Sequence, residues 1–281
     1  MDLIGVDLGA TNVRAARVLD GKLEKVARQK LKKEGSAGVI FDQITGLINE
    51  VKSGSEEGIG IGVPSVVDVE KGIVRDVQNI PSWKEVPLKQ MLEEACSVPV
   101  CVNNDANCFV LGETYFGKAR GFRNVVGLII GTGMAAGLVL GGRLHAGPNC
   151  GAGEIGMIPY RDSILEHYSA GQFFERRYHT DGKKVFQKAR QGDSRALDMY
   201  KEFGTHVGNG ILVALYAYDP EIIVLGGSGR HGYPFFQQSM RETLNNFAYQ
   251  NSLKKMVIEL SGDDHMALLG AAALVLDTLH P

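Results

Sequence analysis

Cysteine and long apolar runs are scarce in this chain of 281 residues. Its four cysteines include no Cys-x-x-Cys pair, so neither a disulfide framework nor a zinc knuckle is indicated. Even the apolar run at 266–276 falls well short of the roughly 20 residues that span a bilayer. The sequence opens with no basic segment followed by an apolar stretch and a cleavage site, so we expect a cytoplasmic protein with no membrane partner.

An excess of positive charge is also missing. The formal net charge is -2, charged residues make up 22% of the chain, and basic runs such as 30–34 are short. A basic surface for nucleic acid is therefore not expected. With 44% hydrophobic residues the chain can bury a sizeable core, and its length favours two lobes.

The chain twice repeats the order strand, glycine turn, strand. The first repeat joins 3–6 to 13–19, and the second joins 125–130 to 134–140. Further strands are expected at 23–31, 59–63, 98–102 and 221–225, and helical spacing of apolar residues appears at 39–51, 88–96, 106–116, 194–218, 234–247 and 266–279. This mixture predicts an α/β protein.

The first glycine turn, 7–12, has the composition of a phosphate-binding turn. Gly9 lets backbone N–H groups approach an anion, and the side chains of Thr11 and Asn12 add donors. Asp7 repels phosphate but can hold the water shell of a Mg²⁺ ion that bridges phosphates. An ordinary hairpin with Asp and Gly in its turn is the alternative.

A second candidate phosphate turn consists of Gly131, Thr132 and Gly133. Together with Gly137 it imitates the dinucleotide fingerprint of an oxidoreductase, but that fingerprint must open a helix, whereas a strand is expected here. Gly226 and Gly227 follow a buried strand and form a plausible nucleotide platform, or a plain turn.

Three carboxylates stand out as candidates for chemistry. Asp105 follows the expected strand 98–102, and ligands gather at the carboxyl ends of such strands; a helix cap is its alternative role. Glu154 lies in a glycine-dense stretch that lets backbone approach a ligand. Glu154 and Glu166 are otherwise read as surface residues, the default for glutamate.

In their order along the chain these motifs resemble the ROK sugar kinases, a family that includes bacterial glucokinases and fructokinases and kinases of N-acetylmannosamine and N-acetylglucosamine. The resemblance covers almost the whole sequence. The matching segments are 7–12, Gly60-Ile61-Gly62-Val63-Pro64, Asn79-Ile80-Pro81-Ser82-Trp83, 102–107, 131–133, Gly153-Glu154-Ile155-Gly156, 165–171 and 225–228.

The resemblance implies an α/β, two-lobe actin-like ATPase (ribonuclease H-like) fold with a central cleft. Residues 1–107 would form the N-terminal lobe, on which 265–281 could pack back, and 108–264 the C-terminal lobe. The resemblance also implies that the protein is a homodimer and that it phosphorylates a sugar hydroxyl with ATP and Mg²⁺. A glucokinase-like reaction at the 6-hydroxyl of a hexose is the first expectation.

The same resemblance assigns roles to individual residues. Asp105 would be the general base on the acceptor hydroxyl, while Asn79, Asn104, Glu154 and Glu166 would order the sugar hydroxyls. The glycine turns would hold the nucleotide.

Two departures from the family pattern affect metal and substrate. Met157 stands where members commonly have His after Glu-Ile-Gly, and 158–165 contains no cysteine where they have a Cys-x-Cys-Gly-x-x-Gly-Cys cluster. We therefore expect no zinc site. Substrate identity stays open among glucose, fructose, N-acetylmannosamine and N-acetylglucosamine. A non-catalytic sugar-binding member is the other alternative, although a repressor is expected to carry a helix-turn-helix before Asp7, and an inactive relative to lose Asp105.

Overall fold

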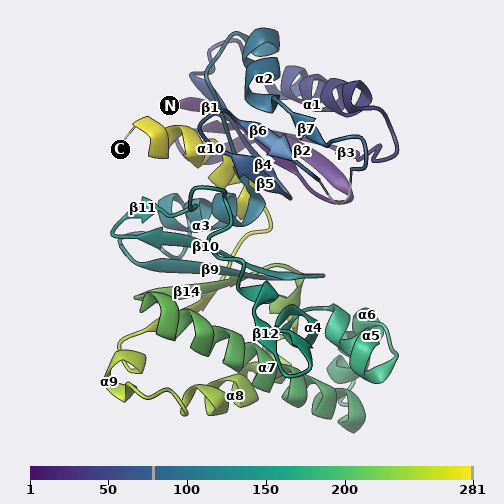
Figure 1. The fold of residues 1–281 in the computed structure, drawn as a ribbon, viewed down its shortest axis with the longest axis vertical. Helices are drawn as coiled ribbons and strands as arrows, with labels where there is room; N and C mark the ends of the chain where they lie inside the picture. Colours follow the sequence, from purple (N-terminus) through teal and green to yellow (C-terminus); the bar gives the residue numbers. More distant parts are fainter. Residues whose placement is uncertain (78–79, 280–281) are drawn as a thin grey trace. The chain divides into compact units, whose positions relative to one another are not determined.

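A computed structural model of the chain describes residues 1–77 and 80–279 (Figure 1). The fold divides into two compact units. Unit 1 comprises residues 1–121, 137–152 and 262–281, and unit 2 comprises residues 122–136 and 153–261. The lobe limits expected from the sequence stay a prediction.

The first sheet has the strand order β3-β2-β1-β4-β8 and lies in unit 1. Strands β1, β2 and β3 form an antiparallel meander, and β4 and β8 continue the sheet parallel to β1. Their bounds are Asp2–Leu8, Asn12–Leu19, Lys22–Lys30, Gly58–Val63 and Val100–Asn104. The meander and both parallel strands match the expectations from the sequence.

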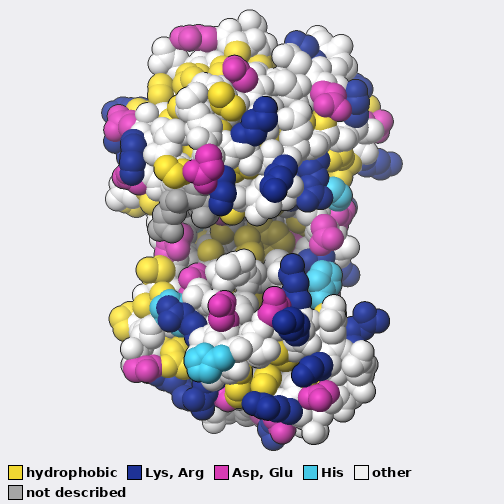
Figure 2. Space-filling view, turned by 90° about the vertical axis from the view of Figure 1, so that its right-hand side faces the viewer, with side chains coloured by type: hydrophobic (Ala, Val, Ile, Leu, Met, Phe, Trp, Pro, Cys, Tyr) yellow, Lys and Arg dark blue, Asp and Glu magenta, His cyan; other side chains and the backbone are white. Residues whose placement is uncertain are grey.

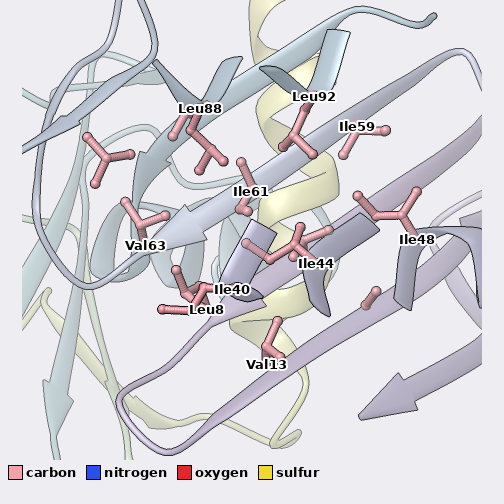
Figure 3. Packing of buried hydrophobic residues seen from close by; sticks show 14 of the residues in the cluster. Leu8, Val13, Ile40, Ile44, Ile48, Ile59, Ile61, Val63, Leu88 and Leu92 are labelled. Atoms are coloured by element: carbon pink, nitrogen blue, oxygen red, sulfur yellow. The ribbon is translucent and has the colours of Figure 1, made fainter. Parts of the chain in front are cut away.

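Alternation of isoleucine and glycine along β4 gives the two faces of this sheet different coverings. Ile59, Ile61 and Val63 join a buried cluster with side chains of α1 (Ala37–Val51) and α2 (Leu88–Cys96), as Figure 3 shows. Side chains two apart share a face, so the glycines between them present the opposite face. This pattern gives β4 one face that packs into the buried core with the helices. Its other face carries only glycines.

Helix α10 (Met266–Leu279) lies against the glycine face. A Cβ atom on Gly5 would lie 2.1 Å from the Leu268 carbonyl oxygen, and one on Gly60 would lie 1.6 Å from that of Ala271. No larger residue fits at either position without moving the helix. Helix α3 (Asp105–Tyr115) packs beside α10, since a Cβ on Gly270 would lie 1.6 Å from the Cys108 carbonyl oxygen. The glycine face of the sheet therefore lets α10 approach closely, and α3, which follows β8, lies beside α10.

The second sheet has the order β11-β10-β9-β14-β15. Strands β9 (Val125–Ile130), β14 (Ile222–Gly226) and β15 (Val257–Leu260) are parallel, and β10 (Met134–Leu140) follows β9 after the second glycine turn. The long helix α7 (Ser194–Tyr218) packs against α8 (Tyr233–Leu244) in unit 2. Both repeats of strand, turn and strand that the sequence predicts are therefore present.

The remaining elements are short. They are β5 (Val66–Asp68), β6 (Ile73–Arg75), β7 (Glu85–Val86), β11 (Arg143–Leu144), the 3-10 helices η1 (Ile155–Met157) and η2 (Ser228–Gly232), β12 (Pro159–Tyr160), β13 (Ser163–Ile164), α4 (Glu166–Ser169), α5 (Gln172–Tyr178), α6 (Gly182–Arg190) and α9 (Gln250–Leu253). Among the described residues, none of the helices combines the length and the apolar character needed to cross a bilayer.

Candidate active site

Asp105 lies where β8 ends and α3 begins, as the sequence predicts. It is the first residue of the helix, and the cap is Asn104, whose Oδ1 accepts a hydrogen bond from the Ala106 N–H at 2.8 Å. One Asp105 carboxylate oxygen lies 2.9 Å from the same nitrogen. The capping role considered for Asp105 therefore belongs first to its neighbour. The amino end of a helix also favours a negative charge, so this position suits a carboxylate.

The Asn104 side chain is already engaged by the protein at both ends. Besides the cap, its Nδ2 donates to the Ser65 carbonyl oxygen at 3.4 Å. These contacts orient the amide but do not identify a sugar contact, so its predicted role in substrate binding stays a prediction. Asn79, the other asparagine expected to bind sugar, lies outside the described residues.

A buried polar cluster beside Asp105 was not found by sequence reasoning. Asn103, Asn107 and Cys150 are 3%, 1% and 3% exposed, and the Asn103 Oδ1 lies 2.9 Å from the Asn107 Nδ2 and 3.0 Å from the Cys150 Sγ. The repeated amides at 103, 104 and 107 were the only signal in the sequence. Nothing local linked them to a cysteine more than forty residues away.

The first glycine turn connects β1 to β2 and carries Asp7 at its start. Arg14 holds this carboxylate through two hydrogen bonds to one oxygen, from Nη2 at 2.6 Å and Nε at 3.0 Å. A third bond, from Arg14 Nη1 to the Asp264 carbonyl oxygen, ties the pair to the segment before α10. The second carboxylate oxygen, Oδ1, has the chemistry to hold the water shell of a Mg²⁺ ion, which prefers oxygen ligands.

Other predicted residues of the first turn adopt a tight backbone geometry. The Gly9 N–H donates to the Asn12 carbonyl oxygen at 2.9 Å, and Thr11 is exposed at the tip. The Asn12 Oδ1 accepts from Arg28 Nε at 3.2 Å. The turn is thus closed by one backbone bond and has its hydroxyl donor at the surface.

The second glycine turn is supported from outside by a carboxylate. Glu166 Oε2 accepts the Met134 N–H at 2.9 Å, and Oε1 accepts from Gln172 Nε2 at 2.8 Å. A Cβ on Gly133 would lie 2.4 Å from Glu166 Oε2, so glycine is required for this approach. Both oxygens of a residue expected to bind sugar hydroxyls therefore already accept a hydrogen bond within the protein, one from the residue after the turn and one from α5.

A pocket of about 640 Å³ opens beside this turn within unit 2. Gly131 and Thr132 lie in its wall, together with the aromatic rings of Phe174, Tyr200 and Phe203. Its other lining residues are Ile130, Gly171, Gln172, Glu175, 179–183, Phe186, Ser228, Gly229, His231 and Gly232. Apolar walls with a few convergent polar groups are typical of small-molecule sites, and flat rings suit a planar base.

Ser228 and Gly229, which follow the glycine platform of Gly226 and Gly227, line one edge of the pocket. Gly227 has φ of +76°, and a Cβ there would lie 2.3 Å from the Ile130 carbonyl oxygen. Gly229 packs on the Ile130 side chain in the same way. Gly226 ends β14 and, like Gly227 and Gly133, is not among the residues that line the pocket. The aromatic wall and α6 were missed in the sequence because no motif marks them.

Glu154 differs from Glu166 in its surroundings. It is exposed, yet desolvation of its carboxyl group, followed by the negative charge of Glu166, raises its pKa. Met157, at the position expected for histidine, is 58% exposed. Glu154 thus stays available for a ligand, whereas Glu166 is committed to the turn.

An aromatic cluster occupies the segment where the family resemblance places zinc ligands. Residues 159–164 form the β12–β13 hairpin, and the Tyr160 hydroxyl lies 3.0 Å from Nδ1 of the buried His206. Tyr168 and Phe173 pack edge-on against the same imidazole, with ring centroids 5.0 and 5.5 Å away. Over the described ranges no three His, Cys, Asp or Glu side chains are grouped as metal ligands. The absence of zinc stays a prediction.

Charged side chains of both signs are interspersed on the face of the molecule that Figure 2 presents. This surface agrees with the formal net charge of -2. It gives no indication of a partner, and the expected absence of nucleic-acid binding stays a prediction.

Comparisons with known proteins identify the family. The sequence model described as "ROK family" matches residues 3–278. A glucokinase of Thermotoga maritima is 31% identical over 98% of this chain and 97% of its own length, and an N-acetyl-D-glucosamine kinase of Vibrio cholerae is 28% identical over 96% and 98%. The crystal structure of a Streptomyces griseus ROK glucokinase with glucose and AMPPNP is 25% identical, with a TM-score of 0.82 over 98% of this chain and 99% of that one. The chain belongs to the ROK family and has the α/β actin-like ATPase fold that its sequence predicts.

Proposed function

We propose that this chain, an ATP-dependent sugar kinase, transfers the γ-phosphoryl group of ATP to the 6-hydroxyl of a hexose, with glucose as the first candidate. The observation that carries the proposal is the position of Asp105 on the first turn of α3, directly after a buried strand. A different residue, Asn104, caps the helix. The similarity to a glucokinase over nearly the whole chain supports glucose as the acceptor.

Proton transfer at Asp105 is the central step of the proposed mechanism. A carboxylate oxygen of Asp105 accepts the proton as the sugar hydroxyl oxygen forms its bond to the γ-phosphorus, and the bond to the bridging oxygen of ADP breaks in line. Most of the catalysis comes from positioning, because phosphoryl transfer requires little covalent chemistry from the protein. A fixed helix start is well suited to this role.

The nucleotide is proposed to lie in the pocket of unit 2. Its base would stack on the aromatic wall formed by Phe174, Tyr200 and Phe203. Its phosphates would meet the turn of Gly131, Thr132 and Gly133, in which the Gly131 N–H already donates to the Gly133 carbonyl oxygen. Gly9, Thr11 and Asn12 of the first turn would contribute the other phosphate contacts.

Asp7 fits the expected Mg²⁺ because it offers a carboxylate oxygen outside the Arg14 bonds. When bound, the ion neutralises phosphate charge. This chain's part is to hold the coordinated water through Asp7 and to limit the net negative charge there through Arg14.

Sugar recognition is proposed for Asn79, Asn104, Glu154 and Glu166. Glu154 is the residue best placed to accept hydroxyl hydrogen bonds, because its carboxylate is exposed while Glu166 already accepts two. A homodimer is part of the proposal and is tested by sedimentation equilibrium.

A coupled ADP-release assay over hexoses, ketoses and N-acetylated amino sugars tests the proposed function, with ATP compared against other phosphoryl donors. The expected result is the highest kcat/KM on glucose, with 31P–1H correlation spectra placing the phosphate on the 6-oxygen. ADP release with an N-acetylated sugar or fructose as the best acceptor would assign one of the alternative kinases. Sugar binding by calorimetry without ADP release for any acceptor would support the non-catalytic alternative.

A further inference from the structure

Three buried polar side chains lie close together at the junction of β8 and α3, where Asp105 begins the helix. Asn103 is the penultimate residue of β8, Asn107 is the third residue of α3, and Cys150 comes from the segment after β11. Asn107 Nδ2 lies 2.9 Å from Asn103 Oδ1 and 3.4 Å from Cys150 Sγ, and the thiol lies 3.0 Å from Asn103 Oδ1. Together they close a triangle within unit 1.

The donors and acceptors of this triangle are fixed by one backbone group. Asn103 Oδ1 also lies 2.8 Å from the Asn104 backbone nitrogen, which can only donate, so this atom is the amide oxygen. Asn107 must then present its NH₂ group, and the Cys150 thiol must donate to the same oxygen. One acceptor collects three donors, and reversing either amide would set like groups against each other.

Asn103 and Asn107 flank Asp105 at equal distance along the chain. The hydrogen bond between their side chains therefore spans the junction from strand to helix, with Asp105 at its centre. The bond from the Asn104 N–H fixes the residue in between. A strap of this kind determines where the Asp105 backbone lies and so limits the positions that its carboxylate can reach.

The backbone conformation at Cys150 indicates that the hydrogen bonds of its thiol stabilise this segment. Its φ is +56°, in the left-handed region that glycine occupies most easily, and a side chain there is unfavourable by itself. The thiol is buried and bonded within the triangle, which offsets this conformation. Cys150 is also four residues before Glu154, so it anchors the start of the segment that carries the proposed sugar carboxylate.

We propose that Asn107 and Cys150 are positioning residues that hold Asp105 through Asn103, and that the Cys150 thiol acts in this network as a hydrogen-bond donor. The proposal rests on the proposed function for its catalytic part. Its structural part concerns the order of the helix start and is independent of any substrate.

Variants of two buried cysteines test this role. Cys150→Ala removes the donor, Cys150→Ser restores a hydroxyl donor, and Cys108→Ala removes an equally buried thiol of α3 that is outside the triangle. We expect Cys150→Ala to lower kcat about tenfold or more while the KM for ATP changes less than about twofold, because a small displacement of a catalytic group has large effects. Cys150→Ser is expected to recover kcat to within about threefold of the native enzyme, and Cys108→Ala to keep kcat within about twofold even if its Tm falls.

A second measurement separates this proposal from the proposed function. Amide hydrogen exchange at Asn104 and Ala106, the two N–H donors of the helix start, should speed up at least about fivefold in Cys150→Ala and return toward the native rate in Cys150→Ser. Native exchange at both amides in Cys150→Ala would overturn the proposal, as would equal kcat losses in the alanine and serine variants. If the native protein phosphorylates no sugar, the exchange measurement still decides the positioning role.

Discussion

The two glycine turns resemble each other in sequence but are held in different ways. The β1–β2 turn is closed by a bond between Gly9 and Asn12 and has an ion pair, Asp7 with Arg14, at its base. The β9–β10 turn is also closed by a backbone bond, from the Gly131 N–H to the Gly133 carbonyl oxygen at 2.9 Å. Its outside support comes instead from Glu166 and from the Gly171 N–H, which donates to the Gly131 carbonyl oxygen at 2.8 Å. One turn thus has an ion pair at its base, and the other has neighbouring hydrogen bonds and a pocket beside it.

This difference shows that a carboxylate beside a glycine turn can support the backbone next to that turn. The half-buried Glu166 carboxylate accepts the N–H of Met134, the residue directly after the second turn. Asp7 is partly neutralised by Arg14, and under the proposed function its other oxygen would hold the water of a hydrated cation. On this division neither carboxylate is the base, and that role is assigned to Asp105.

The largest expected effect follows from this assignment. Asp105→Asn should lower kcat by about 10²–10⁴-fold, because an amide cannot accept the hydroxyl proton. Nucleotide binding, measured by calorimetry with a non-hydrolysable analogue, should be unchanged. Asn104 still caps α3 in this variant, so the fold is expected to persist. Near-native turnover would show that Asp105 is not the base, and the separate roles given to Asp7, Glu166 and Asp105 would then be wrong.

A comparison of the two glutamates sharpens the account of the second turn. Glu166→Gln leaves one of two donors, the Met134 N–H or the Gln172 amide, facing an NH₂ group. We expect KM to rise for both ATP and sugar by about 1–3 kcal/mol in free energy, roughly 5- to 150-fold. Glu154→Gln, the matched substitution, should raise KM for sugar only.

Steady-state kinetics with each substrate varied in turn distinguish these outcomes.

The surroundings of Glu154 raise its pKa, so the fold disfavours the charged form of this carboxyl group. Any stability that the group contributes is therefore present at low pH and lost as the pH rises through that pKa. Glu154→Gln should therefore not reduce the Tm at neutral pH. If Glu166→Gln affects sugar alone, the turn does not depend on this carboxylate.

Much of the fold was predictable because local patterns and tertiary packing agree. The Ile and Gly alternation of β4 predicts a strand whose faces differ, and the change from an apolar run to amides marks the end of β8 before Asp105. The Asp7–Arg14 pair needed one more piece of information, the hairpin register, which sets these two residues directly opposite each other.

The parts that were missed depend on contacts that no local pattern encodes. Helix α6 is mostly polar and basic and has only two buried residues, Val185 and Ala189, so few apolar positions mark it in the sequence. The pocket wall combines aromatic side chains from α5, α6 and α7, which meet only after unit 2 has folded. Cys150 reaches Asn103 across 47 positions of sequence. Long-range pairing of this kind cannot be read from spacing.

A smaller effect is expected at the first turn. Arg14→Ala removes a positive charge that competes with a cation near Asp7, so the free Mg²⁺ concentration for half-maximal activity should fall about 2- to 10-fold. The measurement is activity against free Mg²⁺ at saturating ATP and sugar. An unchanged or raised midpoint would contradict the assignment of Asp7 to the metal.

Arg17→Ala is the matched control, since Arg17 pairs with Asp2 at the other end of β1. Arg17 and two serine hydroxyls lower the Asp2 pKa to about 2, so this pair contributes stability above pH 3.8 that is lost as the pH falls toward 2. The control should lower the free energy of unfolding at pH 7 by about 1–2 kcal/mol and leave the Mg²⁺ midpoint unchanged.

The last prediction is the absence of a metal effect at the second turn. Glu166, which supports that turn, begins α4 directly after the β12–β13 hairpin, and the hairpin is held by Tyr160 and Tyr168 packed on His206. Side-chain packing thus occupies the place where the family pattern has zinc ligands, and segment 158–165 contains no cysteine thiolate. Treatment with a strong chelator followed by restoration of Mg²⁺ should leave kcat and both KM values unchanged, and elemental analysis should find well under one zinc per chain. Stoichiometric zinc whose removal raises KM for ATP would mean that a metal, rather than Glu166 and its neighbours, maintains the second turn.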